Sequence, residues 1–245
     1  MNSPLLLIDA DYFFYRAATT AEIEMEYSED VTVIAGDFNR GRDVVKRELK
    51  NLRTMFDSDN ILLTFTASDN FRKDVDPEYK GNRVKRKPCG YLKLKKWGME
   101  AYPSITKPRL EADDVMGILA TNGTLDNFIL ISPDKDMAQI ACRIYDLKTE
   151  YTQTPRAAKR LLYKQTLQGD STDGYKGCVG VGPKRADQIL DKVKNEDYWP
   201  AVVAAFEEAG MTEADALRNF YLARILQVGD YDVINQVPLF PHSCD

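Results

Sequence analysis

Three short apolar runs, each followed closely by an acidic residue, constrain the fold more than any other feature of the chain. They span residues 5–8, 61–66 and 128–132, and their length and β-branched content predict buried strands. Helical patterns lie between them at residues 41–56 and 111–120, where apolar residues recur every three or four positions. Strands that alternate with helices predict an α/β fold, with a mostly parallel sheet and helices on both faces.

From residue 155 onward the sequence carries helical patterns alone, after a weaker strand-like run at residues 143–147. Helices are expected at residues 155–167, 183–193, 198–209 and 212–226. This change of pattern places a boundary near residue 150. We therefore predict an α/β body at residues 1–150 and a helical region at residues 151–245.

Acidic residues gather where the carboxyl ends of the predicted strands meet. Asp9 ends the first apolar run, and Asp134 follows the third. Ligands of open α/β sheets collect at this edge. The acids that fall at this edge, in the first turn of the helix at 111–120, or in the turn-rich segment GDSTDG are Asp9, Asp69, Glu111, Asp113, Asp114, Asp134, Asp136, Asp170 and Asp173.

Each of these acids alone has an ordinary explanation as a turn former or as a partner of a helix dipole. Together they would repel one another strongly unless cations bind among them. Hard divalent cations prefer oxygen ligands, and Mg²⁺ suits a few carboxylates combined with waters and a phosphate. The pattern therefore predicts two divalent cations at a site for phosphoryl transfer.

The net charge of −5 conceals one strongly basic segment. Residues 80–96 contain eight basic residues and no acidic one, which leaves the rest of the chain at about −13. A basic run is often only a solvated surface. Here the wider segment 71–97 interleaves its cations with aromatic residues such as Phe71 and Tyr79, a composition suited to phosphate contacts and base stacking.

A glycine-rich turn precedes the helix expected at residues 183–193. Gly180 and Gly182 allow a close approach of the backbone, and the helix N-terminus after them presents N–H groups to an anion. Lys184 and Arg185 add positive charge beside it. This arrangement predicts an element that holds a DNA backbone without reading bases, although a simple turn before a helix is the alternative.

Several classes of protein are excluded by composition. No apolar run approaches the length of a membrane span, and the N-terminus lacks a signal peptide pattern, so we expect a soluble intracellular protein with no membrane partner. The four cysteines include no C-x-x-C pair, which argues against a zinc site and a disulfide framework. The single histidine, His242, lies three residues from the end, so catalysis by an imidazole base is not expected.

Five motifs in a fixed order give the chain a family resemblance. After Asp9 come FRK…EYKGNR at 71–83, LEADD at 110–114, SPDKD at 132–136 and GDSTDGYKGCVGVGPKRA at 169–186. In this order the chain resembles the flap-endonuclease superfamily of structure-specific 5′ nucleases. Phrases such as KPCGYL, ADDVMG and GMTEADALRNFYLARIL resemble the 5′→3′ exonuclease branch of short-tailed bacteriophages. The resemblance covers nearly the whole chain.

The resemblance implies a fold and a division of the chain. It implies a PIN-like α/β body that includes a basic helical arch at residues 71–97 over the active site. It also implies a helical DNA-binding region with a helix-three-turn-helix and a hairpin at residues 174–190. Because the arch segment is short here, an open clamp is the alternative to a closed hole.

The resemblance also implies roles for single residues. One metal would be held by Asp9, Glu111, Asp113 and Asp134, and the second by Asp136, Asp170 and Asp173, with Asp114 and Asp69 nearby. Relatives carry an acid at the strand end where this chain has Ala67, so Asp69 departs from the pattern. Lys80 and Arg83 would bind the scissile phosphate as catalytic cations, and Tyr79 would stack on a base. The further DNA contacts implied are Arg72, Lys73, Lys85, Arg86, Lys87, Gly180, Gly182, Lys184 and Arg185, with K⁺ at the hairpin.

The function implied is that of a 5′→3′ exonuclease with two divalent cations, Mg²⁺ or Mn²⁺. The expected substrates are duplex DNA with 5′ ends, nicks, gaps or flaps, and RNA–DNA hybrids. The expected roles are primer removal and DNA turnover during phage replication in the cytoplasm of an infected bacterium. We expect a monomer.

Two alternatives compete with this interpretation. A haloacid-dehalogenase-type phosphatase also uses Asp-x-Asp after a strand, here Asp9 and Asp11, with Asp9 as covalent nucleophile. It would use Ser132 and the pair Gly169 and Asp170, but it leaves LEADD and the glycine-rich turn without a purpose. A non-catalytic module that binds DNA ends would use only the basic segment and the hairpin, and it does not explain the clustered acids.

Overall fold

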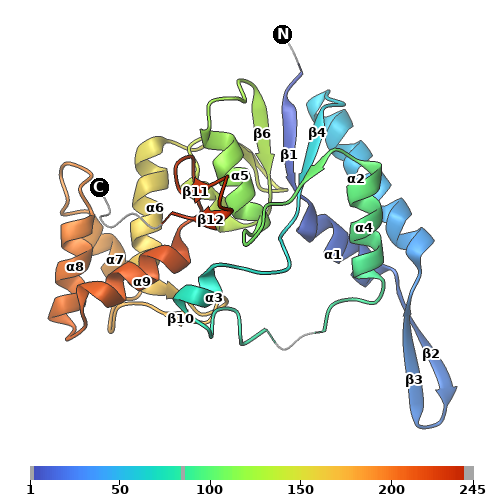
Figure 1. Ribbon diagram of the computed structural model, residues 1–245, viewed down its shortest axis with the longest axis horizontal. Coiled ribbons are helices and arrows are strands. Elements are labelled where there is room, and N and C mark those ends of the chain that lie inside the picture. Colours follow the sequence, from blue (N-terminus) through green and yellow to red (C-terminus); the bar gives the residue numbers. More distant parts are fainter. Residues whose placement is uncertain (1–2, 84–85, 240–245) are drawn as a thin grey trace.

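A six-stranded sheet forms the centre of the α/β body (Figure 1). The computed structural model describes residues 3–83 and 86–239. The strands run in the order β5-β4-β1-β6-β7-β8. Their bounds are β1 (Leu5–Asp9), β4 (Ile61–Thr64), β5 (Ser104–Ile105), β6 (Phe128–Ile131), β7 (Arg143–Tyr145) and β8 (Glu150–Thr152). All neighbours pair in parallel except β7 and β8, so the expected mostly parallel sheet is confirmed.

Helices cover both faces of this sheet, which explains why its strands read as unbroken apolar runs. Leu6 and Ile8 of β1 face one side, and Leu7 faces the other; none of the three exposes any surface. The first side is covered by α1 (Ala10–Thr20), α2 (Phe38–Phe56) and α4 (Tyr91–Ala101), and the second by α5 (Ala112–Thr121). Figure 1 shows α5 apart from the other three helices, across the sheet.

The helical region has a core of its own. Its helices are α6 (Pro155–Gln168), α7 (Pro183–Leu190), α8 (Trp199–Glu208) and α9 (Glu213–Ala223). Tyr163, Phe206 and Phe220, from three of these helices, are almost completely buried together. The four expected helices are therefore confirmed, and the division of the chain into two domains stays a prediction.

Short elements connect the body to the helical region. They are the 3₁₀ helix η1 (Lys135–Gln139) and the ribbon strands β9 (Gly169–Asp170), β10 (Tyr175–Lys176), β11 (Tyr231–Asp232) and β12 (Val237–Pro238). Gly169 has a φ of 68°, and a Cβ there would lie 2.2 Å from the nitrogen of Gly177, so the β9–β10 ribbon requires glycine at this position. Within the described ranges, no helix combines the length and the apolar character needed to cross a membrane.

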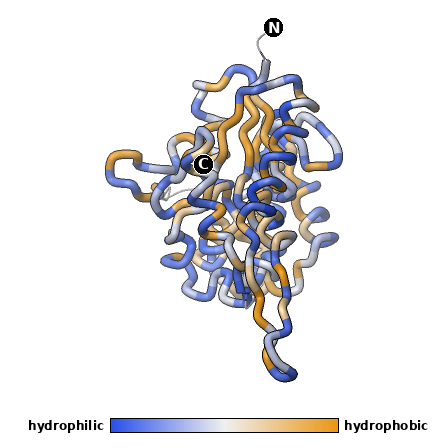
Figure 2. The backbone as a smooth tube through the Cα atoms, turned by 90° about the vertical axis from the view of Figure 1, so that its right-hand side faces the viewer, coloured by the Kyte–Doolittle hydropathy of each residue, from blue (hydrophilic) through white to orange (hydrophobic). Residues whose placement is uncertain are grey.

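A long hairpin between α1 and α2 was not expected from the sequence. Its strands β2 (Glu22–Ser28) and β3 (Val31–Gly36) project from the body (Figure 2). The alternation of acidic and apolar residues in EIEMEYS has the period of two that is typical of a strand, so the signal was present in the sequence. The apolar side chains on one face remain exposed, to 83% for Tyr27.

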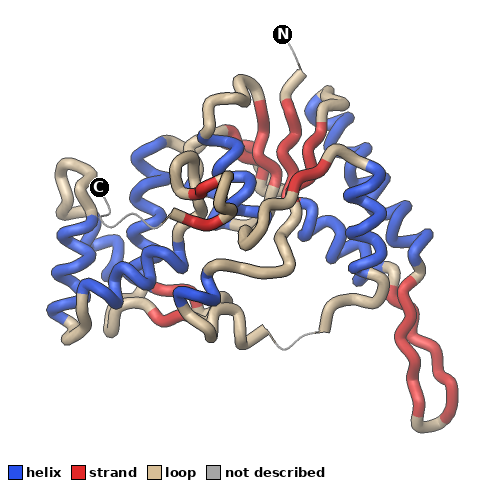
Figure 3. The backbone as a smooth tube through the Cα atoms, in the orientation of Figure 1, coloured by secondary structure: helices blue, strands red, loops and turns tan. Residues whose placement is uncertain are grey.

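The basic segment at residues 71–97 does not form the expected helical arch in its described part. It contains the four-residue helix α3 (Arg72–Val75), then turns and loop, and then the start of α4 (Figure 3). α4 belongs to the body, because Tyr91 and Leu94 are buried in the same core as α1. A Cβ at Gly98 would lie 2.2 Å from the ring of Phe14, so α4 packs directly on α1. The expected helical arch is therefore not present in residues 71–83 and 86–97.

Candidate metal centre

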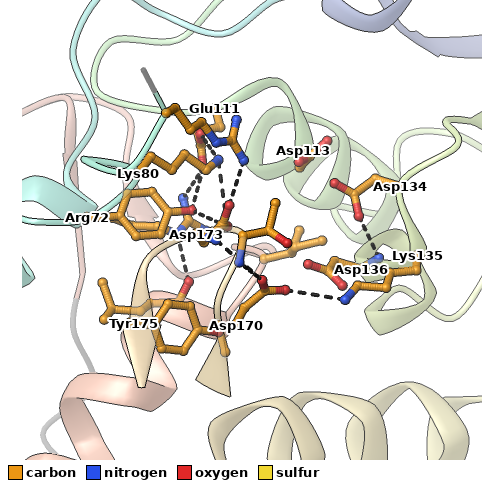
Figure 4. A pocket seen from close by; sticks show the side chains of 16 residues that line it. Arg72, Lys80, Glu111, Asp113, Asp134, Lys135, Asp136, Asp170, Asp173 and Tyr175 are labelled. Atoms are coloured by element: carbon orange, nitrogen blue, oxygen red, sulfur yellow. Dashed lines mark hydrogen bonds and ion pairs between the residues drawn. The ribbon is translucent and has the colours of Figure 1, made fainter. Parts of the chain in front are cut away.

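Six acidic side chains from distant parts of the sequence line one small pocket at the carboxyl edge of the sheet. The pocket encloses about 120 Å³. Its acids are Glu111, Asp113, Asp134, Asp136, Asp170 and Asp173, and its bases are Arg72, Lys80, Arg83 and Lys135. Figure 4 shows these groups converging from α5, η1, the β9–β10 ribbon and the segment after α3.

The parallel strands β1 and β6 bring Asp9 and Asp134 to this edge. Ile8 and Ile131 are paired in the sheet, so the residues that follow them lie side by side. The hydroxyl of Ser132 donates to Asp9 Oδ2 at 2.9 Å and accepts the N–H of Asp134 at 3.1 Å. Asp134 in turn caps η1 by accepting the N–H of Asp136 at 2.9 Å. These bonds hold three acids in a fixed arrangement.

Burial and mutual repulsion make several of these acids resist ionisation. Burial and the neighbouring Asp11 raise the pKa of Asp9 to about 7. Burial, together with Asp9 and Asp134, raises the pKa of Asp113 well above its usual range. Burial and Asp134 raise the pKa of Asp136 to about 6. Cations among these groups would remove the repulsion, and the all-oxygen donor set suits hard divalent ions such as Mg²⁺.

Basic side chains pair with the remaining acids. Lys80 Nζ lies 2.5 Å from Glu111 Oε1, and Arg83 lies 2.6 Å from Asp173. Burial opposes ionisation of Glu111, but Lys80 and Arg72 outweigh it and lower the pKa of Glu111 to about 2. Within residues 3–83 and 86–239, no group of three or more acidic, histidine or cysteine side chains is arranged so that it could hold a metal ion. The acids surround one pocket, and several of them face cations of the same chain.

Arg72 and Asp114 form a buried ion pair, which corrects both of their expected roles. Arg72 is 3% exposed and donates to both oxygens of Asp114 at 2.7 Å. It also donates to the carbonyls of Leu222 and Arg224. Asp114 has no exposed surface and accepts the N–H of Leu226 as well. This arrangement does not support a DNA contact for Arg72 or a metal-ligand role for Asp114, because each is bonded to the other inside the protein.

Two further expectations need correction. Tyr79 is 2% exposed, so its ring offers no face for a base to stack on. Its hydroxyl lies 2.9 Å from Asp173 Oδ2 and 3.1 Å from Glu111 Oε2. Asp69 is exposed, accepts the N–H of Arg109 at 3.3 Å, and does not line the pocket, so its position does not support a role as metal ligand.

The remaining basic residues of the segment are spread along its length. Lys73 is exposed, and Lys85 lies outside the described residues. Arg86 pairs with Glu22 of the hairpin at 2.5 Å. The ammonium of Lys87 lies 5.7 Å from the ring of Tyr91.

The glycine-rich turn places its charges at the start of α7, as expected. Gly180 has a φ of 74°, and Gly182 is the residue before the first turn of the helix. Lys184 and Arg185 are exposed in that turn. This exposed helix start is free to approach a ligand backbone.

Two residues of the site were missed in the sequence. Lys135 pairs with Asp170 at 3.3 Å, and its place between two acids in SPDKD could have indicated it. Gln165 of α6 donates to Asp136 at 2.5 Å. No local pattern marks Gln165, because its role depends on how α6 packs against η1.

Comparisons with known proteins agree with this geometry. Residues 4–165 match the family described as 5′–3′ exonuclease, N-terminal resolvase-like domain. The chain is 30% identical to an exonuclease of Escherichia phage T7, over 95% of this chain and 91% of that one. It is 30% identical to an exodeoxyribonuclease of Enterobacteria phage T3, over 95% and 90%.

A solved structure has a similar fold. It is a bacteriophage T5 flap endonuclease in a pseudo-enzyme-product complex with DNA and metal ions, with a TM-score of 0.66 and 18% identity over 90% of this chain and 88% of that one. This likeness supports the α/β fold with its mostly parallel sheet. Together with the family match over more than half of the sequence, it leads to one conclusion: the chain belongs to the 5′–3′ exonuclease family.

Proposed function

We propose that this protein is a metal-dependent 5′→3′ exonuclease that hydrolyses phosphodiesters near the 5′ ends of duplex DNA. The observation that carries the proposal is the pocket in which six acids and the cations Lys80 and Arg83 converge. The phage relatives named as an exonuclease and an exodeoxyribonuclease support the same activity. The site requires no histidine and no protein nucleophile.

Seven acids, the six that line the pocket and the neighbouring Asp9, would form two groups that hold two divalent cations, Mg²⁺ or Mn²⁺. Their side chains would have to move to do so, because no three of them within the described residues are now arranged to hold a metal ion. One group comprises Asp9, Glu111, Asp113 and Asp134, and the other comprises Asp136, Asp170 and Asp173. When bound, such ions supply a water of lowered pKa and positive charge that stabilises the leaving oxygen. The pocket lining holds six acids against four bases, and burial and repulsion oppose ionisation of Asp113 and Asp136, which agrees with a need for cations.

Lys80 and Arg83 would bind the scissile phosphate. Both now pair with acids of the pocket, and cations bound to those acids would free them for a phosphate at its mouth. Water attacks the phosphorus in line, the bond from phosphorus to the 3′ oxygen breaks, and that oxygen leaves as a hydroxyl. The released nucleotide or short oligomer therefore ends in a 3′ hydroxyl, and the shortened strand carries the new 5′ phosphate.

The exposed start of α7 would bind the duplex backbone at a distance from the phosphodiester that is cleaved. Backbone N–H groups after Gly182, together with Lys184 and Arg185, suit a phosphate of either strand and carry no base preference. The proposal therefore includes a helix-three-turn-helix contact with the duplex, in which K⁺ would bridge the backbone N–H region and the phosphate. The proposal also covers the substrates, which would include nicks, gaps, flaps and RNA–DNA hybrids. The protein would act in primer removal in the cytoplasm of an infected bacterium, and it would act as a monomer.

The phosphatase alternative is weakened by the surroundings of Asp11. Its carboxylate accepts from the hydroxyl of Tyr91 at 2.6 Å, from Lys95 at 3.1 Å and from the N–H of Thr66 at 2.7 Å. A second acid that serves as proton donor and acceptor would need access to the substrate. Asp11 instead ties the start of α1 to the segment after β4 and to α4.

The substitution Asp134→Asn tests the function. It removes one negative charge from the pocket and should lower hydrolysis of a 5′-labelled nicked duplex at least a hundredfold, while duplex affinity without metal stays within about threefold. Product length on denaturing gels and binding by fluorescence anisotropy measure the two effects. Asp69→Asn is the matched control, because Asp69 is an exposed acid outside the pocket, and it should cleave at the wild-type rate. Wild-type cleavage by Asp134→Asn would refute the proposal.

A further inference from the structure

A chain of buried amide hydrogen bonds leads from the helical region to Asp136. Gln165 of α6 donates through Nε2 to Asp136 Oδ1 at 2.5 Å and accepts at Oε1 from Nε2 of Gln139 at 2.6 Å. Gln139 also donates to the carbonyl of Ala223 at 2.7 Å and accepts the N–H of Ile225 at 3.0 Å. Gln165 is 4% exposed and Gln139 is 3% exposed. The two glutamine side chains are therefore shielded from water, and only the Asp136 end of the chain reaches the pocket.

The direction of each amide in this chain is determined by the backbone. The N–H of Ile225 is only a donor, so the oxygen of Gln139 must face it. The nitrogen of Gln139 then faces two acceptors, the carbonyl of Ala223 and the oxygen of Gln165. This leaves the nitrogen of Gln165 toward Asp136, so the backbone after α9 fixes a donor at that carboxylate.

Asp136 needs such a donor, because the neighbouring acids repel its carboxylate out of the pocket. It lines the acidic pocket beside Asp134 and Asp170, both of which repel its charge (Figure 4). A carboxylate held by one oxygen in a buried bond presents its second oxygen in one orientation. Without the bond, the side chain would be free to rotate toward solvent and away from the other acids.

We propose that Gln165 is a positioning residue, which holds Asp136 in the orientation needed to bind the second divalent cation. The inference rests on the proposed function, because that function supplies the cation. Residues that orient metal ligands are worth about ten- to a hundredfold in metal affinity. Arg160 of α6 also forms an ion pair with Asp187 of α7 at 2.8 Å. The same helix therefore contacts both the metal site and α7, whose start is proposed to bind the duplex.

The test compares Gln165→Met with wild type and uses Mn²⁺ as probe. Met keeps the length and volume of the side chain but donates no hydrogen bond, so one of two Mn²⁺ ions should bind about tenfold more weakly by calorimetry without DNA. The Mg²⁺ concentration for half-maximal hydrolysis should rise by a similar factor, and excess Mg²⁺ should restore the rate. Gln165→Asn, which is too short to reach Asp136, should give the same losses if Gln165→Met does not fold.

Gln153→Met is the matched control. Gln153 donates its amide to the carbonyl of Ala138 at 2.7 Å, so its loss disturbs the same element, η1, without touching Asp136. It should leave Mn²⁺ affinity at the wild-type value. Wild-type Mn²⁺ affinity in both Gln165 variants, or an equal loss in Gln153→Met, would overturn the inference alone. Failure of the wild-type protein to bind Mn²⁺ or cleave DNA would overturn the proposed function, and the inference with it.

Discussion

At the scale of single residues, the contrast between Arg72 and its neighbour Lys73 shows how one motif divides between structure and function. Both stand in the FRK motif, but Arg72 is buried on Asp114 whereas Lys73 is exposed. Removal of one partner from a buried ion pair leaves the other charge uncompensated, which costs about 3–5 kcal/mol. Arg72→Met should therefore lower the free energy of unfolding by about that amount, measured by urea denaturation. Lys73→Met should change it by less than about 0.5 kcal/mol.

The opposite outcome for Arg72→Met would support the expected role of Arg72 as a DNA contact. If Arg72→Met kept its stability and instead lost affinity for DNA, the arginine would be a phosphate contact after all. The sequence could not separate these roles, because Asp114 lies 42 residues away and only the packing of α3 against α5 brings the two together. Tyr79 was misassigned for the same reason, since an aromatic residue among cations has the same pattern whether it is buried or exposed.

At the scale of elements, the predictions that depended only on the strands of the sheet were confirmed. The apolar runs predicted β1, β4 and β6, and parallel pairing of these strands brings Asp9 at the end of β1 and Asp134 after β6 to a common edge. α4 packs in the body and not in an arch, because Tyr91, Leu94 and Gly98 form a buried face on a helix whose other side is charged. The hairpin of β2 and β3 was missed because it contributes nothing to the core.

The acidic edge predicts an unusual dependence of stability on pH in the metal-free protein. The pKa values of Asp9 and Asp136 are raised to about 7 and about 6 in the folded state, from 3.8 in a free chain. The folded state therefore holds protons that the unfolded chain has lost, and the stability they contribute is complete below about pH 4. It is lost as the pH rises to about 7. Glu111, with a lowered pKa of about 2, acts only below pH 4.5 and does not oppose this trend.

Urea denaturation in EDTA at several pH values measures this effect. The free energy of unfolding should fall between about pH 4 and pH 7, and Mg²⁺ should offset most of the fall, because cations favour the ionised carboxylates of the folded state. Asp9→Asn should flatten the profile, because Asp9 has the higher of these two raised pKa values. A profile that rises from pH 4 to pH 7 in EDTA would mean that the acids are well solvated and not crowded.

At the scale of the whole molecule, the chain has to bind a polyanion although its own net charge is −5. Long-range attraction is therefore weak, and affinity must come from local cations placed against phosphates. The β9–β10 ribbon and its turn contribute Asp170, Asp173 and Tyr175 to the pocket, and only residues 177–182 separate this ribbon from the start of α7. A duplex that spans both would have its cut strand fixed at one end and its backbone held at the other.

The salt dependence of duplex affinity tests whether α7 forms the second end of this contact. Lys184 is exposed in the first turn of α7, so Lys184→Ala should weaken binding at low salt and reduce the slope of log affinity against log salt by about 0.9. Lys46→Ala is the control, because Lys46 is exposed on α2, at the opposite end of the molecule (Figure 1). Since each phosphate contact releases its own counterions, an unchanged slope in Lys184→Ala would place the duplex elsewhere. An equal change in Lys46→Ala would show that overall charge alone controls binding.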